Sequence, residues 1–253
     1  MRFRFKAFGL HLLGSVSALG LVLGGLYLGW YRWPGWYLAG ALKVALVMAG
    51  VDVVLGPLFT LLVANAAKPR RELARDIAVI VTVQLCALIY GAATLWHGRP
   101  LYYTFSEDRL ELVAASDLSP QEIALARRSN PQFAPHWYSR PRWVWAPLPE
   151  EGAERSRIIQ SALAGNDDVI DMPRYFRSWE SGLPALRRQL RPLKAQRDVR
   201  FMGRKERLAQ RMVQRGYLPD QPATLLLAGR AGTLLAVFDP DTLRIRALLR
   251  VDQ

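Results

Sequence analysis

The sequence predicts a membrane protein with three transmembrane α-helices, followed by an α+β extracytoplasmic domain with an antiparallel sheet. Three long apolar runs, each near the roughly 20 residues needed to cross a bilayer, lie before residue 98. No comparable run follows, and the rest of the chain alternates between helical and strand-like periodicity. We therefore expect a three-helix transmembrane domain over residues 1–98 and an extracytoplasmic α+β domain over residues 99–253.

The three spans are expected at about residues 8–31, 41–64 and 76–97. The first follows a basic start but has a longer apolar core than a signal peptide and no A-x-A-like exit, so it is predicted to be an uncleaved signal anchor. Basic residues before span one and after span two outnumber those between the two spans, which places the N-terminus in the cytoplasm. The aromatic residues Trp30, Tyr31, Trp33, Trp36, Tyr37 and Trp96 fall on the predicted outer side.

Within the C-terminal domain, a hairpin is expected at residues 101–105 and 110–113, before a helix at 120–128 that Ser119 caps. An ordered loop is expected over 130–149. Further helices are predicted at 150–164, 183–196 and 204–214, and strands at 223–228, 233–238 and 243–249. The sheet would then combine strands from both ends of this domain.

Asp52 lies in the apolar segment VDVVLGPLFTLLV, where an ionisable group near the bilayer centre costs roughly 2.5 to 3.5 kcal/mol. Counted from the cytoplasmic ends of their spans, Asp52 and Gln84 lie within roughly 6 Å in depth, and Ser17 is at a similar level. Asp52 is therefore either a polar clamp inside the bundle or a contact for a polar group of a partner's helix. Gly56-Pro57 predicts a kink and a close helix approach one turn further on.

Span one carries small residues at helical spacing, namely Gly14, Ala18, Gly25 and Gly29 on one track and Gly20 with Gly24 on another. Such tracks allow close contact between helices. They serve either packing within the bundle or docking of a partner helix.

The C-terminal domain is basic, with 25 Lys/Arg against 18 Asp/Glu, and residues 174–215 are the most basic part. This run is either a solvated face or a surface that meets anionic headgroups or an acidic partner. Nucleic acid is not an expected partner outside the membrane, in spite of the pI of about 10.4.

We expect no enzyme activity and no cofactor, since the sequence contains no zinc, thiol-redox, phosphate-loop or nucleophile-elbow motif. The three histidines, His11, His97 and His136, are far apart in the sequence. Asp167, Asp168 and Asp171 suit a metal or a sugar nucleotide in principle, but an N-D-D segment more often forms a turn.

The segment VDVVLGPLFTLLV, together with Gln84, Tyr90-Gly91 and RPLYYTFSEDRLELVAASDL, resembles the type IV pilin accessory proteins of the TfpX/TfpZ family. The resemblance implies a bacterial inner-membrane protein that acts beside the major pilin and promotes its stability or assembly into pili. Pilus assembly platform proteins are further expected partners, and the basic C-terminal domain predicts contacts with membrane lipids. Two alternatives remain: a membrane-embedded pilin-modifying enzyme and a structural component of the platform.

The resemblance and the polar site together suggest that span one and the Gly56-Pro57 kink form a groove for a pilin helix. The residues expected to contact the partner are Asp52, Gly56, Pro57, Gln84, Gly25, Gly29, Arg99 and Arg109.

Overall fold

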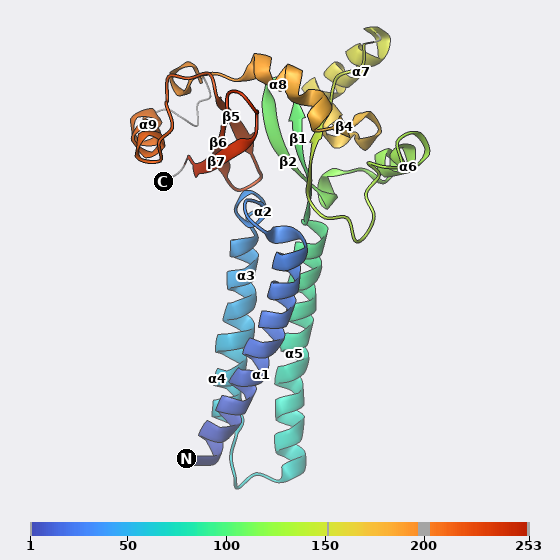
Figure 1. The fold of residues 1–253 in the computed structure, drawn as a ribbon. Helices are drawn as coiled ribbons and strands as arrows, with labels where there is room; N and C mark the ends of the chain where they lie inside the picture. Colours follow the sequence, from blue (N-terminus) through green and yellow to red (C-terminus); the bar gives the residue numbers. More distant parts are fainter. Residues whose placement is uncertain (1, 151, 197–202, 252–253) are drawn as a thin grey trace. The chain divides into compact units, whose positions relative to one another are not determined.

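The computed structural model describes residues 2–150, 152–196 and 203–251 (Figure 1). The chain divides into two compact units. The helix bundle contains the residues up to Arg32 together with Gly40–Gly98. The α+β domain contains Trp33–Ala39 and the residues from Arg99 onward.

The helix bundle contains three helices that are long and apolar enough to cross a membrane, Arg2–Tyr31, Ala41–Val63 and Arg70–His97. The first comprises α1 (Arg2–Leu26) and a π-helical turn, η1 (Tyr27–Tyr31). The second comprises α3 (Ala41–Ala49), the π-helical η2 (Gly50–Leu55) and α4 (Gly56–Val63), and the third is α5 (Arg70–His97). The prediction of three spans is confirmed.

The first and third helices begin earlier than the apolar runs predict, at Arg2 and Arg70. Their first turns are rich in Arg and Lys, which favour helices nearly as well as Leu, so the helix continues through the basic flank. Apolar side chains cover the outside of the bundle: Leu10, Leu21 and Tyr90 are 75%, 78% and 77% exposed. An apolar exterior is what a bundle surrounded by lipid requires.

The two units meet at Gly98 and Arg99, where the boundary was expected, but the short connection between the first two spans, Trp33–Ala39, belongs to the α+β domain and not to the helix bundle. It forms α2 (Gly35–Leu38), and the Leu38 side chain is fully buried in a core cluster with Leu227, Leu234 and Phe238. The Leu38 carbonyl accepts a hydrogen bond of 2.9 Å from the Ala231 N–H. The sequence did not predict this packing, because a short connection rich in aromatic residues has the same pattern whether it lies in the headgroup layer or against a sheet.

The α+β domain contains a seven-stranded sheet in the order β4-β3-β1-β2-β5-β6-β7. The strands are β1 (Pro100–Ser106), β2 (Arg109–Ala114), β3 (Arg142–Trp145), β4 (Arg177–Ser178), β5 (Thr224–Ala228), β6 (Thr233–Phe238) and β7 (Ile245–Arg250). The α+β class is confirmed, as is the joining of early and late strands. The sheet is nevertheless mixed, because β1 pairs with β3 and β2 with β5 in parallel. The predicted antiparallel pairing holds for the other neighbours.

The helices of this domain are α6 (Pro120–Ser129), α7 (Gly152–Leu163), α8 (Leu183–Gln189) and α9 (Lys205–Gln214). Ser119 caps α6 as predicted, because its Oγ accepts the Glu122 N–H. The helix predicted over 183–196 ends at Gln189, since Pro192 cannot continue it and Arg191 bridges to Thr224. The loop predicted over 130–149 contains β3, a strand too short to show a period of two.

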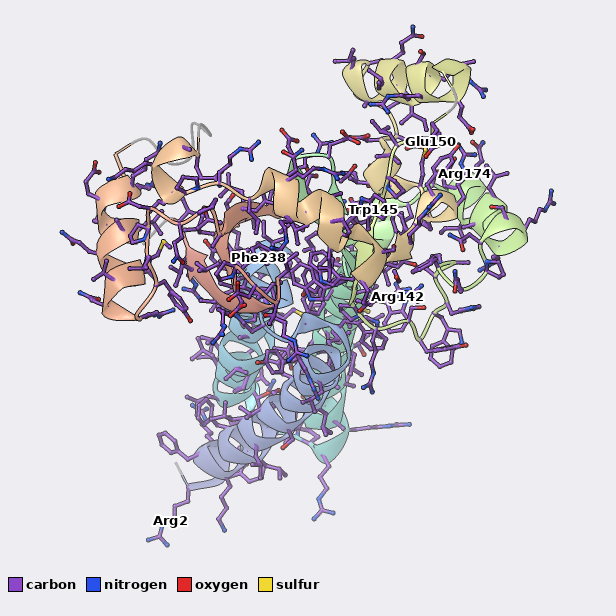
Figure 2. All side chains as sticks on the ribbon, turned by 45° about the horizontal axis from the view of Figure 1, so that its top comes forward. Arg2, Arg142, Trp145, Glu150, Arg174 and Phe238 are labelled. Atoms are coloured by element: carbon purple, nitrogen blue, oxygen red, sulfur yellow. The ribbon has the colours of Figure 1, made fainter. Side chains whose placement is uncertain are left out.

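The remaining elements are short 3₁₀ turns: η3 (Ala115–Asp117), η4 (Val169–Asp171), η5 (Pro173–Tyr175), η6 (Glu180–Gly182) and η7 (Leu193–Ala195). Figure 2 shows the side chains on the ribbon, with Trp145 and Phe238 in the α+β domain. Phe238 is 2% exposed, and Trp145 packs so closely on Gly182 that a Cβ there would lie 2.6 Å from Cγ of the indole ring. The core of this domain is therefore close-packed around the sheet.

Candidate functional site

Polar side chains from all three membrane helices meet inside the bundle. The Gln84 Nε2 donates to the Asp52 carbonyl at 2.9 Å and to Ser15 Oγ at 3.3 Å, while Gln84 Oε1 lies 2.6 Å from His11 Nε2. His11 Nδ1 lies 2.5 Å from Thr60 Oγ1. With the His11 proton on Nε2, the imidazole donates to Gln84 and accepts from the Thr60 hydroxyl, so every bond in this chain has one donor and one acceptor.

The bond from Gln84 to Asp52 follows from the π-helical turn and from proline. The Gly56 N–H donates to the Val51 carbonyl, five residues back. The same spacing would pair the Asp52 carbonyl with residue 57, which is Pro57 and has no N–H. The Gln84 side chain supplies the missing donor. Asp52 and Gln84 therefore meet as the depth argument predicted, but through the backbone carbonyl of Asp52 rather than its carboxylate.

Gly56 makes room for this bond. A Cβ at Gly56 would lie 2.0 to 2.4 Å from the amide atoms of Gln84, so a larger residue would displace that side chain. Gly56 and Pro57 are both buried. The close helix approach that Gly56-Pro57 predicted is thus made by the chain's own third span.

A cleft of about 420 Å³ opens beside this cluster, between α1, the η2–α4 helix and α5. Its lining is mainly apolar and comprises Ala7, Leu10, His11, Gly14, Ser15, Ala18, Asp52, Thr60, Ile77, Val81, Gln84, Leu85 and Leu88. Asp52 is 4% exposed, and its Oδ2 has no hydrogen-bond partner among the described residues. A buried carboxylate oxygen without a donor is costly, and this oxygen belongs to a residue that lines the cleft.

Two of the small residues of span one lie at the cleft. Gly14 and Ala18 line the cleft. A Cβ added at Gly14, Gly25 or Gly29 would meet nothing within 4 Å, so these glycines mark no close helix contact in the described bundle. Ser17, which was expected near the depth of Asp52, is exposed. Ser15 lies in the polar cluster instead and accepts a hydrogen bond from Gln84 Nε2.

His11 is the site residue that sequence reasoning missed, because it is far in the sequence from the other two histidines and was given no partner. The spacing of the polar residues could have indicated this site. His11 and Ser15 are four residues apart, and Asp52, Gly56 and Thr60 follow one another at intervals of four residues. Residues four apart share one face of a helix. Polar and small residues repeated at this spacing in an apolar helix predict one polar face.

The two arginines predicted to contact a partner lie in the α+β domain. Arg99 is buried, and its carbonyl accepts the Ala115 N–H at 2.9 Å. Arg109, at the start of β2, forms ion pairs with Glu111 (3.1 Å) and with Asp168. The predicted contact residues therefore fall into both units, and only Asp52 and Gln84 among them line the bundle cleft.

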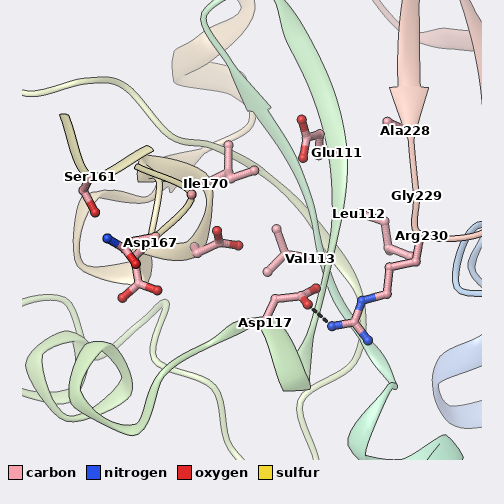
Figure 3. A pocket seen from close by; sticks show the side chains of 13 residues that line it. Glu111, Leu112, Val113, Asp117, Ser161, Asp167, Ile170, Ala228, Gly229 and Arg230 are labelled. Atoms are coloured by element: carbon pink, nitrogen blue, oxygen red, sulfur yellow. Dashed lines mark hydrogen bonds and ion pairs between the residues drawn. The ribbon is translucent and has the colours of Figure 1, made fainter. Parts of the chain in front are cut away.

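A second cleft, of about 940 Å³, lies in the α+β domain (Figure 3). Asp117 and Arg230 form an ion pair on one side, and Glu111, Asp167 and Asp171 also line it. Burial, and next the charge of Asp117, raise the pKa of the Asp171 carboxyl to about 7. This cleft holds more carboxylates than basic side chains, and the charge of one of them, Asp171, depends on pH near neutrality.

The Asp167-Asp168-Asp171 segment forms a turn. The Asp168 carboxylate accepts the Val169 N–H at 2.6 Å and caps η4. Within residues 2–150, 152–196 and 203–251, no three His, Cys, Asp or Glu side chains are grouped as metal ligands. The segment is explained as the start of a short helix.

These features define an integral membrane protein with a polar cleft between its spans and an α+β domain. The chain is similar to two fimbrial assembly proteins of Dichelobacter nodosus over 99% of its length and 96% of theirs: that of serogroup I, 26% identical, and that of serogroup E1, 28% identical. It is also 31% identical over 124 residues to the fimbrial assembly protein of serogroups C1 and C2, covering 49% of this chain and 95% of the relative. The chain belongs to the family of these fimbrial assembly proteins.

No known family profile matches the chain. No solved structure matches it either.

Proposed function

We propose that the protein is a non-enzymatic, chaperone-like accessory protein of the bacterial inner membrane, which binds the major type IV pilin and promotes its stability or assembly. The fimbrial assembly relatives support a role in pilus assembly. The resemblance to the TfpX/TfpZ proteins supports pilin as the client. One observation carries the mechanism: a buried, unpaired carboxylate oxygen of Asp52 in an apolar cleft between membrane helices.

In this proposal the cleft holds one apolar helix of the client. Gly14 and Ala18 form part of its wall, and small residues let two helix backbones approach closely. Leu10 and Leu85, which are 75% and 50% exposed, add apolar area on the two sides. Shape and dispersion contacts thus provide most of the affinity, since lipid tails remove the hydrophobic advantage of association within a membrane.

Asp52 would add selectivity. It lies 12 residues from Ala64, about 18 Å along the helix from the cytoplasmic end of the second span. The N-terminal amine of a client helix, if it lies near the cytoplasmic edge of the membrane, would not reach Asp52. The proposed donor is therefore a hydroxyl or an amide within the client's transmembrane helix, and binding that donor offsets the cost of burying the carboxylate.

The proposed orientation has the N-terminus in the cytoplasm and the α+β domain in the periplasm. The basic flank before span one and the four Lys/Arg of the second connection, Lys68, Arg70, Arg71 and Arg75, support it.

The test is photocrosslinking in cells that express native pilin, with the probe at positions matched for exposure. Leu10 lines the cleft, whereas Leu13, on the same helix and 65% exposed, does not. Leu85 and Val83 (60% exposed) form a second pair on α5. We expect the major pilin to be captured from Leu10 and Leu85 and not from Leu13 or Val83.

Equal capture from all four positions, or capture of platform proteins alone, would reject the groove and favour a structural component of the platform. A mass increase on pilin that depends on this protein would favour the modifying enzyme. Asp52→Leu tests the carboxylate: we expect pilin association to fall about fivefold, the equivalent of about 1 kcal/mol for a hydrogen bond between membrane helices. Unchanged association would make Asp52 dispensable to binding.

A further inference from the structure

We propose that the turn at residues 136–139 of the α+β domain is a membrane contact, in which Trp137 and Tyr138 enter the headgroup layer of an anionic bilayer. The turn lies outside both clefts. Trp137 is 72% exposed and Tyr138 is 59% exposed. Large aromatic side chains that a soluble surface leaves open in this way mark an interaction site.

The turn is built to present these two rings. The Ser139 N–H donates to the His136 carbonyl at 3.1 Å, and the His136 N–H donates to Ser139 Oγ at 2.8 Å. Trp137 and Tyr138 occupy the two central positions, where Pro, Asp, Asn or Gly is usual. The His136 ring stacks on Tyr138 with centroids 5.3 Å apart, so the tip is ordered by its own contacts.

The segment before the turn is fixed to the first strand. Phe133 is buried, and its carbonyl accepts the Tyr102 hydroxyl at 2.6 Å. The Arg142 guanidinium lies 4.8 Å from the centre of the Phe133 ring and donates to the Gln132 carbonyl at 2.7 Å. The turn therefore projects from a rigid support.

The strand register places this support at a particular edge of the sheet. β3 runs parallel to β1, with Arg142 opposite Tyr102, so both strands begin at the same edge. β1 begins at Pro100, three residues after the third membrane helix ends at His97. The turn thus lies just before β3, at the edge of the sheet where β1 begins.

The charges around the turn suit anionic lipid. Residues 127–142 contain four arginines and no acidic residue. Arg127, Arg128 and Arg140 are exposed. An arginine near an anionic surface contributes about 1 kcal/mol, and Trp and Tyr prefer the headgroup layer because their rings are apolar and their N–H or O–H is polar.

The inference does not rest on pilin binding, so its test contains no pilin. The full-length protein with Cys86→Ser, which removes the one native cysteine, receives a single cysteine as Tyr138→Cys and carries a nitrobenzoxadiazole fluorophore there. The matched control is Leu163→Cys at the end of α7, where Leu163 is 84% exposed. Both proteins are reconstituted in vesicles of phosphatidylethanolamine and phosphatidylglycerol that contain headgroup-labelled nitroxide lipid.

We expect nitroxide lipid to quench the probe at position 138 and iodide to quench the probe at position 163. Adding Trp137→Ser should abolish most of the lipid quenching. Arg140→Gln should lower the ratio of bound to free turn about fivefold. If Trp137→Ser does not fold, judged by near-UV circular dichroism, the comparison of positions 138 and 163 decides alone.

The proposal is overturned if iodide quenches both positions equally and nitroxide quenches neither. It is also overturned if replacing phosphatidylglycerol by phosphatidylcholine leaves the quenching at position 138 unchanged. In cells, a photoreactive probe at Tyr138 that captures a protein instead of lipid would assign the turn to a protein partner.

Discussion

The helix bundle and the α+β domain differ in what fills their interiors. In the bundle, the buried polar side chains Asp52, Thr60 and Gln84 gather at one place, and apolar side chains cover the outside. In the α+β domain, apolar side chains form the interior, and ion pairs such as Arg109–Asp168 and Arg230–Asp117 lie at least partly exposed. Hydrogen bonds between side chains join the three helices inside the bundle. Apolar packing forms most of the interior of the domain.

Buried glycines in the two units also differ in what surrounds them. Gly56 faces the flexible end of a side chain, Gln84, while Gly229 faces the backbone of Leu38. A side chain has rotamers to which it can move, but a buried backbone does not. The same substitution should thus cost more in the domain than in the bundle.

The largest effect is expected for Gly229→Ala. The added Cβ would lie 2.5 Å from the Leu38 carbonyl oxygen and 2.8 Å from its Cα, so α2 must leave the sheet or the strand must move. We expect a loss of about 3 kcal/mol in the unfolding free energy of the α+β domain, measured by thermal unfolding in detergent. Gly152→Ala is the control, since its Cβ meets nothing within 4 Å. Equal stability of the two variants would mean that α2 is not part of this core.

Gly56→Ala should cost less, about 1 to 3 kcal/mol, because Gln84 can turn away but then leaves the Asp52 carbonyl without its donor. The measurement is unfolding of the full-length protein in detergent. Gly25→Ala should be close to neutral, because a Cβ added there meets nothing within 4 Å. A cost at Gly25 equal to that at Gly56 would show that the small-residue track of span one makes a close helix contact within the bundle.

A pH effect is expected from Asp171. Its pKa is about 7 in the folded domain and 3.8 without the fold's influence, so the folded state binds the proton more tightly. This contribution to stability is present below pH 3.8 and is lost as the pH rises through about 7. Asp171→Asn should stabilise the domain at pH 8 and have little effect at pH 4, in thermal unfolding series. The reverse order of the two differences would contradict the buried, carboxylate-rich setting of this residue.

The smallest effect is expected for Arg109→Ala, because the Arg109 side chain is 48% exposed and its ion pairs are open to solvent. The loss in unfolding free energy should stay under about 1 kcal/mol. The predicted role of Arg109 in partner contact is then testable separately, by pilin co-purification with the stable variant. A large loss of stability would instead make Arg109 a structural residue that joins β2 to the Asp168 turn.

Much of the fold was accessible from local patterns. The three spans follow from apolar length, the β1–β2 hairpin and the last three strands from short strand-like runs on either side of turn sequences, and the start of α6 from Ser119. Each of these signals is contained within some 20 neighbouring residues, and the free energy that decides it is local.

Other features depend on residues that are distant in the sequence. β3 is a strand because β1 lies beside it, and α2 is a core element because Gly229 leaves room for Leu38. The same applies to His11, which no local pattern ties to Gln84, 73 residues away.

The sequence by itself therefore determined that Asp52 lies in a membrane span, near the depth of Gln84, and that its burial must be offset. Only the tertiary structure decided that Gln84 binds the Asp52 carbonyl, that Gly56 admits the glutamine, and that a carboxylate oxygen stays unpaired beside an open cleft. The physical reason is that periodicity sets the depth and face of a side chain, whereas hydrogen-bond partners depend on how the helices are rotated and how closely they pack.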